Sequence, residues 1–195
     1  MNAFARTLVV AVTLFVASTA MAASQTALFA GGCFWCMQYA FDKTKGVTST
    51  LVGYSGGTVA NPTYEQVSSG TTGHFETIQV TYDPAQVTYG ALIETYLENI
   101  DPTDANGQFA DQGTQYMPAI FYADDAQKKA AEHALATIAP KFAPKPIVVK
   151  IQPAKPFYAA EDHHQKYYQK NPDHFQAYEH GSGRADYITR TWGTK

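Results

Sequence analysis

Residues 26–44 read TALFAGGCFWCMQYAFDKT, and this stretch joins two expected elements at the only two cysteines of the chain. Residues 26–30 are apolar and predict a short strand that ends at two glycines. Residues 33–44 contain neither glycine nor proline and predict a helix. Cys33 is therefore expected at or near a helix N-terminus, with Cys36 one turn later on the same face.

The spacing of the two cysteines permits redox chemistry. The helix dipole and unpaired backbone N–H groups stabilise a thiolate at a helix N-terminus, so we expect a lowered pKa for Cys33. Residues i and i+3 of a helix lie close enough for a disulfide, yet a bridge that closes so short a loop stabilises little. We interpret Cys33 and Cys36 as a reactive pair, with a structural pair and half of a zinc site as the alternatives.

The N-terminal segment MNAFARTLVVAVTLFVASTAMAA is typical of a secretory signal peptide. One positive charge at Arg6 precedes an apolar run from Leu8 to Ala17, and Ala20 and Ala22 fit the A-x-A cleavage rule. We expect residues 1–22 to be the signal peptide of an exported, periplasmic protein. A membrane anchor is the alternative, but the apolar run is short for a hydrocarbon core of about 30 Å, and we expect no stable membrane span.

Residues 23–195 are expected to form a single catalytic domain. Removing residues 1–22 from 195 leaves 173 residues, enough for one sizeable core. The net charge of −3 and the scarcity of charge runs do not favour a nucleic-acid partner. Small exported domains often carry several disulfides, and a chain with only two cysteines, three positions apart, does not follow that pattern.

The order of expected elements indicates an α+β fold. After the first strand and helix we expect strands at 46–57 and 74–84, a helix at 87–100, a strand at 114–123, a helix from Asp124 to about Ile138, and a strand at 144–157. This order predicts helices packed on a sheet of the split βαββαβ kind. The tail is rich in tyrosine and histidine, and we expect a short helix at 161–170 and coil elsewhere.

Glu76 is the most informative polar residue outside the cysteine stretch. In HFETIQVTY the alternation of a strand places Glu76 in phase with Ile78, Val80 and Tyr82. A carboxyl on the core side would have a raised pKa and could stay protonated near neutral pH, as a general acid requires. The alternative is that Glu76 lies at the end of the strand and reaches water.

Phe34 and Trp35 separate the two cysteines. Large aromatic residues usually belong to the core, but consecutive residues of a helix diverge by about 100°. At least one of the two rings is therefore expected beside the thiols, as an apolar wall for a ligand.

A zinc site would need further ligands besides the cysteines. The candidate ligands are the tail histidines His163, His164, His174 and His180. Adjacent histidines on a helix point in different directions, so His163 and His164 are not expected to share one ion. We expect no metal.

The chain resembles the A-type peptide methionine sulfoxide reductases over nearly all of residues 23–195. The resemblance is carried by GGCFWC, VGYSGG, NPTYEQV, TGHFETIQVTYDP, DPTDANGQFADQGTQY and AEDHHQKYYQKNP, in this order. It implies a two-layer α/β sandwich with a ferredoxin-like (βαββαβ) core. It also implies reduction of methionine S-sulfoxide, protein-bound and free, to methionine, the reaction that repairs oxidised methionine.

The resemblance also implies the roles of individual residues. Cys33 matches the nucleophile of the family and Glu76 matches its acid. Tyr64 and Tyr116 match the two hydroxyls that bind the sulfoxide oxygen, and Asp111 is expected to support that site.

The remaining matches concern the methyl group and the recycling of the enzyme. Phe34 and Trp35 match the pocket that takes the substrate methyl. Many members have glycine where this chain has Cys36, and they recycle through cysteines near the C-terminus. The tail of this chain has none, so Cys36 is expected to close a disulfide with Cys33. Met117 and His163 also depart from the family pattern, at the expected rim of the site.

The expected partners follow from this chemistry. A disulfide must be opened by an external dithiol, so we expect a thioredoxin-like reductant and no cofactor. Two rival functions remain at this point. A general thiol-disulfide oxidoreductase would have no use for Glu76, Tyr64 and Tyr116, and a metal-binding module would use the cysteines with the tail histidines.

Overall fold

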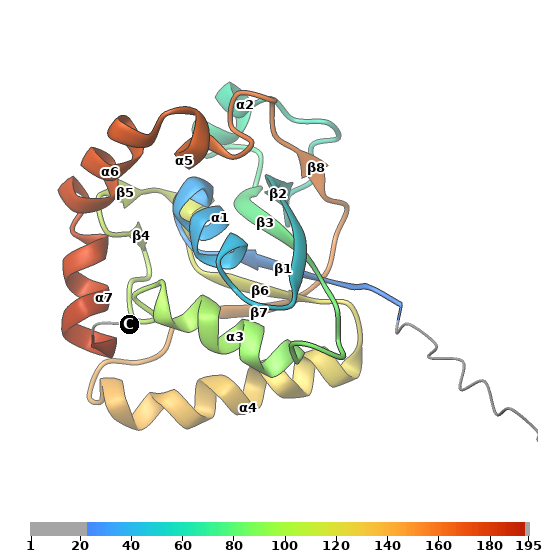
Figure 1. Ribbon diagram of the computed structural model, residues 1–195, viewed down its shortest axis with the longest axis vertical. Coiled ribbons are helices and arrows are strands. Elements are labelled where there is room, and N and C mark those ends of the chain that lie inside the picture. Colours follow the sequence, from blue (N-terminus) through green and yellow to red (C-terminus); the bar gives the residue numbers. More distant parts are fainter. Residues whose placement is uncertain (1–22, 194–195) are drawn as a thin grey trace, which may run out of the picture.

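A six-stranded mixed sheet organises residues 23–193, the part of the chain that this computed structural model describes (Figure 1). The sheet order is β7-β6-β1-β3-β2-β8. The strands are β1 (Gln25–Ala30), β2 (Val47–Ser55), β3 (Phe75–Tyr82), β6 (Ala119–Tyr122), β7 (Lys150–Pro153) and β8 (Tyr158–Ala159). Only the pairing of β6 with β7 is parallel among these strands. A separate hairpin joins β4 (Gly107–Gln108) to β5 (Asp111–Gln112).

Seven helices complete the described part of the chain. They are α1 (Phe34–Asp42), α2 (Tyr64–Ser68), α3 (Tyr89–Glu98), α4 (Asp125–Phe142), α5 (Tyr167–Lys170), α6 (Pro172–Gly181) and α7 (Arg184–Trp192), with a 3₁₀ turn at Thr114–Tyr116. The order β1-α1-β2-β3-α3-β6 is the expected βαββαβ core, because these four strands lie in the order β6-β1-β3-β2 and are all antiparallel. The α+β fold is confirmed, and β7 and β8 extend its two edges.

The main core lies between the sheet and helices α1, α3 and α4. Phe29 of β1 is at its centre, with its ring 5.2 Å from the rings of Phe41 and Tyr96. The Tyr96 hydroxyl also donates a hydrogen bond of 2.8 Å to the carbonyl of Ala30. This bond fixes the end of β1, and with it the start of the turn that leads to Cys33.

The helix starts follow the expected capping chemistry. Thr88 accepts a hydrogen bond of 3.1 Å from the backbone N–H of Ala91 and caps α3. Asp124 caps α4 in the same way, at 2.8 Å from the N–H of Gln127. The helix predicted to end near Ile138 continues to Phe142, with Pro140 in its last turn, where the missing N–H costs one backbone hydrogen bond near the end of the helix.

The prediction of one short helix and coil for the tail is wrong. Residues 162–166 form turns, the helix α5 covers only Tyr167–Lys170, and two further helices follow. Packing rather than periodicity stabilises this segment, because the tail places Phe175 against the cysteine end of α1. Lys166, in the left-handed conformation with φ 52°, anchors the start of the tail through an ion pair of 2.6 Å with Asp42.

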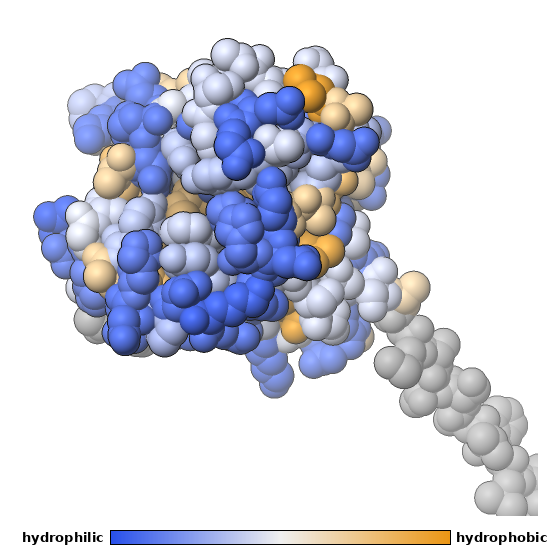
Figure 2. Space-filling model, turned by 90° about the horizontal axis from the view of Figure 1, so that it is seen from above, coloured by the Kyte–Doolittle hydropathy of each residue, from blue (hydrophilic) through white to orange (hydrophobic). Residues whose placement is uncertain are grey.

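The face of the molecule seen in Figure 2 shows no broad apolar area. On the face in Figure 2 the hydrophobic residues are scattered among hydrophilic ones. Leu51 and Val59 are the large hydrophobic side chains that are exposed among residues 23–193. No helix in that range is long and apolar enough to cross a membrane. The predicted signal peptide at 1–22 lies outside the described residues.

Candidate active site

The candidate site forms where the start of α1 meets the first residues of β3. β3 pairs with β1 on one side and with β2 on the other, so its side chains are largely buried. Glu76 is 3% exposed, and one of its carboxyl oxygens accepts a hydrogen bond of 3.0 Å from the backbone N–H of Phe34. The prediction that Glu76 faces the core is therefore confirmed, and the alternative that it reaches water is wrong.

The environment of Glu76 keeps its carboxyl protonated. Burial raises its pKa well above the usual value, and negative charge on Cys33 raises it further. The N–H of Phe34 opposes both effects without cancelling them. A neutral carboxyl beside a thiol is the arrangement that a general acid needs.

Cys33 is the N-cap residue of α1 and lies beside this carboxyl. Its carbonyl accepts hydrogen bonds from the N–H groups of Cys36 and Met37, at 3.2 and 3.4 Å. Both cysteines are free thiols, 6% and 3% exposed. Cys33 thus lies at the helix start, as expected from the sequence, although it is more deeply buried than that position alone suggests.

The expected lowering of the Cys33 pKa is wrong for this structure. Burial raises the pKa of Cys33 well above its usual value, and the contact with Cys36 and the charge of Asp111 act in the same direction. The pKa of Cys36 is lowered, chiefly because the Cys33 thiol donates a hydrogen bond to it. Desolvation therefore outweighs the effect of the helix start, and Cys36 is the thiol that ionises more readily.

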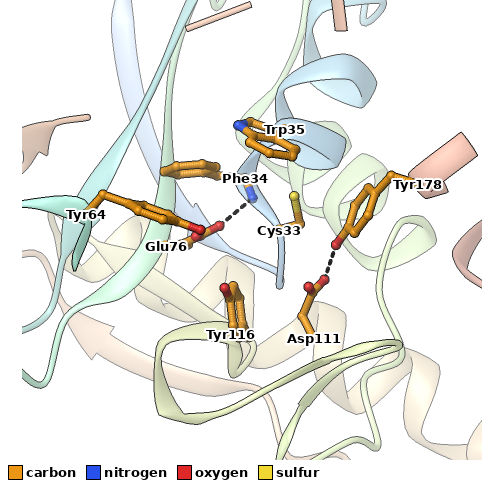
Figure 3. Close-up of a pocket in the computed structure, with 8 residues that line it drawn as sticks. All are labelled: Cys33, Phe34, Trp35, Tyr64, Glu76, Asp111, Tyr116 and Tyr178. Atoms are coloured by element: carbon orange, nitrogen blue, oxygen red, sulfur yellow. Dashed lines mark hydrogen bonds between the residues drawn. The ribbon is translucent and has the colours of Figure 1, made fainter. Parts of the chain in front are cut away.

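A cavity of about 140 Å³ lies over Cys33 and Glu76 (Figure 3). Its lining brings together seven of the eight predicted site residues and one that was not predicted. The lining residues are Cys33, Phe34, Trp35, Tyr64, Glu76, Asp111, Tyr116 and Tyr178. The eighth predicted residue, Cys36, is buried behind the cavity against Phe175 of the tail.

Two phenol hydroxyls face the cavity from different elements. Tyr64 begins α2, and its backbone N–H donates a hydrogen bond of 2.9 Å to Glu161. Tyr116 ends the 3₁₀ turn. Burial raises the pKa of both hydroxyls, and ionisation of Glu76 acts in the same direction. Both tyrosines therefore keep their protons and can donate hydrogen bonds to an oxygen atom in the cavity.

The two aromatic residues between the cysteines both line the cavity. Phe34 is 1% exposed and belongs to a cluster of buried residues that joins α1 to β2. The Trp35 ring stacks on Tyr167 at 3.8 Å, and its N–H donates a hydrogen bond of 3.1 Å to Nδ1 of His164. The tail therefore holds the Trp35 ring in one orientation.

Tyr178 is the site residue that sequence reasoning missed. Its hydroxyl donates a short hydrogen bond to the carboxylate of Asp111, which lies on the opposite side of the cavity mouth from Tyr64 (Figure 3). Burial raises the pKa of Asp111, and this hydrogen bond opposes that effect. No pattern in the sequence separates Tyr178 from the other tyrosines of the tail.

The described residues contain no group of three or more His, Cys, Asp or Glu side chains that could hold a metal ion. The reason given for separating His163 from His164 was wrong, since the segment is a turn and their rings are only 4.1 Å apart. His174 instead shares a hydrogen bond of 3.1 Å with the hydroxyl of Tyr167.

Fold and site together define a thiol-based reductase with an acid and two hydroxyls arranged around a small cavity. The model of the family described as peptide methionine sulfoxide reductase matches residues 25–195, and the chain belongs to this family. It is 51% identical over 172 residues to the peptide methionine sulfoxide reductase MsrA of Bacillus subtilis. These aligned residues cover 88% of this chain and 97% of that protein. The activity of the chain is the reduction of methionine sulfoxide.

Two solved structures resemble this fold. The methionine sulfoxide reductase A of Corynebacterium diphtheriae matches with a TM-score of 0.73 and 38% identity, over 76% of each chain. Mxr1 of Saccharomyces cerevisiae in complex with Trx2 matches with a TM-score of 0.53 and 25% identity, over 74% of this chain and 84% of that chain.

The raised pKa of Glu76 predicts a pH-dependent effect of Glu76→Gln on stability. A carboxyl whose pKa is raised by folding stabilises the folded state at low pH, and this contribution is lost as the pH rises through the raised pKa. Glutamine does not titrate. From about pH 5 to about pH 9 the free energy of unfolding of the variant should therefore rise relative to that of the wild type.

Urea unfolding of both proteins at the two pH values measures this difference. The exposed carboxyl of Glu94 provides the control, since Glu94→Gln should change stability equally at both. A difference between Glu76→Gln and the wild type that is independent of pH would contradict the buried, protonated state of Glu76.

Proposed function

We propose that the chain reduces methionine S-sulfoxide through a sulfenic acid on Cys33 and a Cys33–Cys36 disulfide. The observation that carries this proposal is the hydrogen bond from the Phe34 N–H to Glu76, which holds a protonated carboxyl beside the nucleophile. The cavity is large enough for the methyl sulfoxide end of the side chain and too small for a peptide. The backbone of a protein substrate would therefore stay outside.

The first step needs acid catalysis, because a sulfoxide is a weak electrophile until its oxygen is protonated or strongly hydrogen-bonded. Glu76 donates its proton to this oxygen while the hydroxyls of Tyr64 and Tyr116 hold it. Cys33 attacks the activated sulfoxide, and the proton that its thiol loses replaces the one given up by Glu76. The sulfoxide sulfur is reduced, the oxygen is transferred to Cys33 as a sulfenic acid, and methionine leaves.

The methyl group selects the stereochemistry. With the oxygen held by Glu76 and the two tyrosines, the methyl points to Phe34 and Trp35, and only one epimer then presents its sulfur to Cys33. The stack of Trp35 on Tyr167 supports this role, since a fixed ring discriminates better than a mobile one. We assign the S epimer.

The second step is the condensation of Cys36 with the sulfenic acid. The S–S bond forms, the S–O bond breaks, and the oxygen leaves as water. A thioredoxin-like dithiol then opens the disulfide by exchange. The complex of Mxr1 with Trx2 supports this class of reductant. No metal or cofactor takes part in either step.

The location of the protein is part of the proposal. The composition of residues 1–22 supports export through a signal peptide and a periplasmic role in the repair of oxidised proteins and of free methionine sulfoxide. The electron donor would then be a thioredoxin-like protein of that compartment.

The cysteines predict different stoichiometries. Cys33→Ser should form no methionine from a methionine sulfoxide peptide, because the nucleophile is lost. Cys36→Ser should form about one methionine per enzyme and then stop when a thioredoxin is the reductant, because the sulfenic acid has no resolving thiol. Chromatographic measurement of methionine against enzyme concentration tests both, and full turnover by Cys36→Ser would exclude Cys36 as the resolving residue.

The general-acid role predicts a slower first step in Glu76→Gln. The first methionine should form about 10² to 10⁴ times more slowly than in the wild type, measured in a single turnover without reductant. The amide can still accept the hydrogen bond from Phe34, so the fold should be retained and visible in the circular dichroism spectrum. An unchanged single-turnover rate would exclude Glu76 as the acid.

Export predicts a processed N-terminus. When the full chain is expressed in a Gram-negative host, protein from the periplasmic fraction should begin at Ala23 by N-terminal sequencing. Replacing Leu8 to Ala17 with polar residues should keep the protein in the cytoplasm. Recovery of the exported protein with Met1 retained would contradict cleavage.

A further inference from the structure

Arg184, at the start of α7, is a buried cation that the proposed mechanism does not use. It is 2% exposed and is among the largest fully buried side chains of residues 23–193. Its guanidinium donates hydrogen bonds to the carbonyls of Gly31, at 3.0 Å, and Asn99, at 2.5 Å. It also lies 3.9 Å from the sulfur of Met37 and over the ring of Phe109, 4.6 Å from its centre. None of these partners carries a charge.

No carboxylate of residues 23–193 lies within ion-pair distance of Arg184. The ion pairs closer than 4.0 Å among the described residues join Lys128 to Glu132 and Lys166 to Asp42. A buried charge without a counter-ion is costly, so an arginine in this position calls for a nearby group that becomes negative.

The turn before Cys33 is shaped to admit this cation. Gly32 has φ 75°, and a Cβ on it would lie 2.9 Å from Nη2 of Arg184 and 2.5 Å from Cβ of Gln108. A side chain at Gly32 would therefore displace the guanidinium. As a result, the positive charge lies directly against the backbone that precedes the N-cap of α1.

The groups near this charge that can become negative belong mainly to the site. Burial raises the pKa of Cys33 and the contact with Cys33 lowers that of Cys36, while the charge of Arg184 lowers both. Burial also raises the pKa of Asp111, and the charge of Arg184 opposes this rise. The titratable side chains that interact electrostatically with one or both thiols are Tyr64 of α2, Glu76 of β3, Asp111 of β5, Tyr116 of the 3₁₀ turn, Tyr178 and Glu179 of α6, and Arg184 of α7.

We propose that Arg184 is a positioning residue for the cysteine pair, and that its buried guanidinium stabilises the thiolates through which Cys33 and Cys36 react. The charge opposes the desolvation of both sulfurs, while the hydrogen bond to Gly31 fixes the turn that carries Cys33. Insofar as it concerns catalysis, this inference rests on the proposed function. It assigns the tail, which has no cysteine, an electrostatic part in recycling the enzyme.

The experiment compares charge with hydrogen bonding at position 184. Arg184→Gln keeps an amide donor for the Gly31 carbonyl and removes the charge, whereas Arg184→Lys keeps the charge without the planar fork. Arg190→Met removes an exposed cation from the same helix and is the matched control. The absorbance of the thiolates is followed from about pH 5 to about pH 10 in the reduced proteins. The absorbance of the same variants without the two cysteines is subtracted.

If the charge matters, Arg184→Gln should raise the midpoint of the first thiol transition by about one pH unit. At a pH below that midpoint, the variant should then contain about tenfold less thiolate than the wild type. Arg184→Lys should stay within about half a unit of the wild type, and Arg190→Met should not move. A folded Arg184→Gln with the wild-type midpoint would overturn the proposal. Should that variant not fold, a folded Arg184→Lys decides: a midpoint at the wild-type value supports the charge role, and a rise of a unit or more contradicts it.

Single-turnover kinetics provide the second readout. After one equivalent of methionine sulfoxide, the Cys33 sulfenic acid should persist several-fold longer in Arg184→Gln, as trapping with dimedone and mass spectrometry would show. Equal lifetimes would contradict a role in the second step. Absence of sulfoxide reduction in the wild type would instead refute the proposed function, and the thiolate titration would still test Arg184, because it requires no substrate.

Discussion

The hydrogen bond from the backbone N–H of Phe34 to Glu76 is the interaction on which the site depends. The first N–H groups of a helix have no partner within the helix, and at the start of α1 the carboxyl of a central strand supplies one. Because one carboxyl oxygen accepts this bond, the proton of the neutral acid is best placed on the other oxygen, where it can be donated to a ligand. A single contact between residues 42 positions apart thus fixes the start of α1, with Cys33, beside the carboxyl of Glu76.

Burial has opposite consequences for the two reacting groups. The desolvation that raises the pKa of Glu76 also raises the pKa of Cys33, so it favours a protonated carboxyl and makes the thiol harder to ionise. Exposing the site to water would lower both pKa values. It would make Cys33 easier to ionise, but it would also favour loss of the proton from Glu76. The charge of Arg184 lowers the pKa of both thiols, so it favours a thiolate while the acid stays dry.

Much of this arrangement could be predicted from the sequence, because its causes are local. The two-residue period of β3 placed Glu76 on the core side, and the glycines before Cys33 placed that residue at a helix start. The order of strands and helices predicted the βαββαβ core. The roles of Tyr64, Tyr116 and Asp111 came from the resemblance to a family, since nothing in their own surroundings distinguishes them.

The parts that could not be predicted depend on packing between distant segments. The helices α6 and α7 carry few aliphatic residues, and their contacts are with aromatic and sulfur-bearing side chains of α1. Tyr178 and Arg184 therefore looked like ordinary tail residues. The pKa of Cys33 was mispredicted for the same reason: the effect of a helix start can be inferred from a few residues, whereas desolvation depends on everything that covers the thiol.

The geometry of the cysteine pair explains how a disulfide can form under this cover. Cys33 is a cap residue with a non-helical ψ of 117°, and only Cys36 belongs to the helix. A change in the distance between the sulfurs can then be taken up at Cys33 and at the glycine before it, with any disturbance confined to the first hydrogen bonds of α1. A resolving cysteine on the tail would instead require α6 and α7 to move, and these helices hold Trp35, Asp111 and the buried cation in place. Locating the second thiol on α1 thus allows the pair to oxidise while the tail continues to define the cavity.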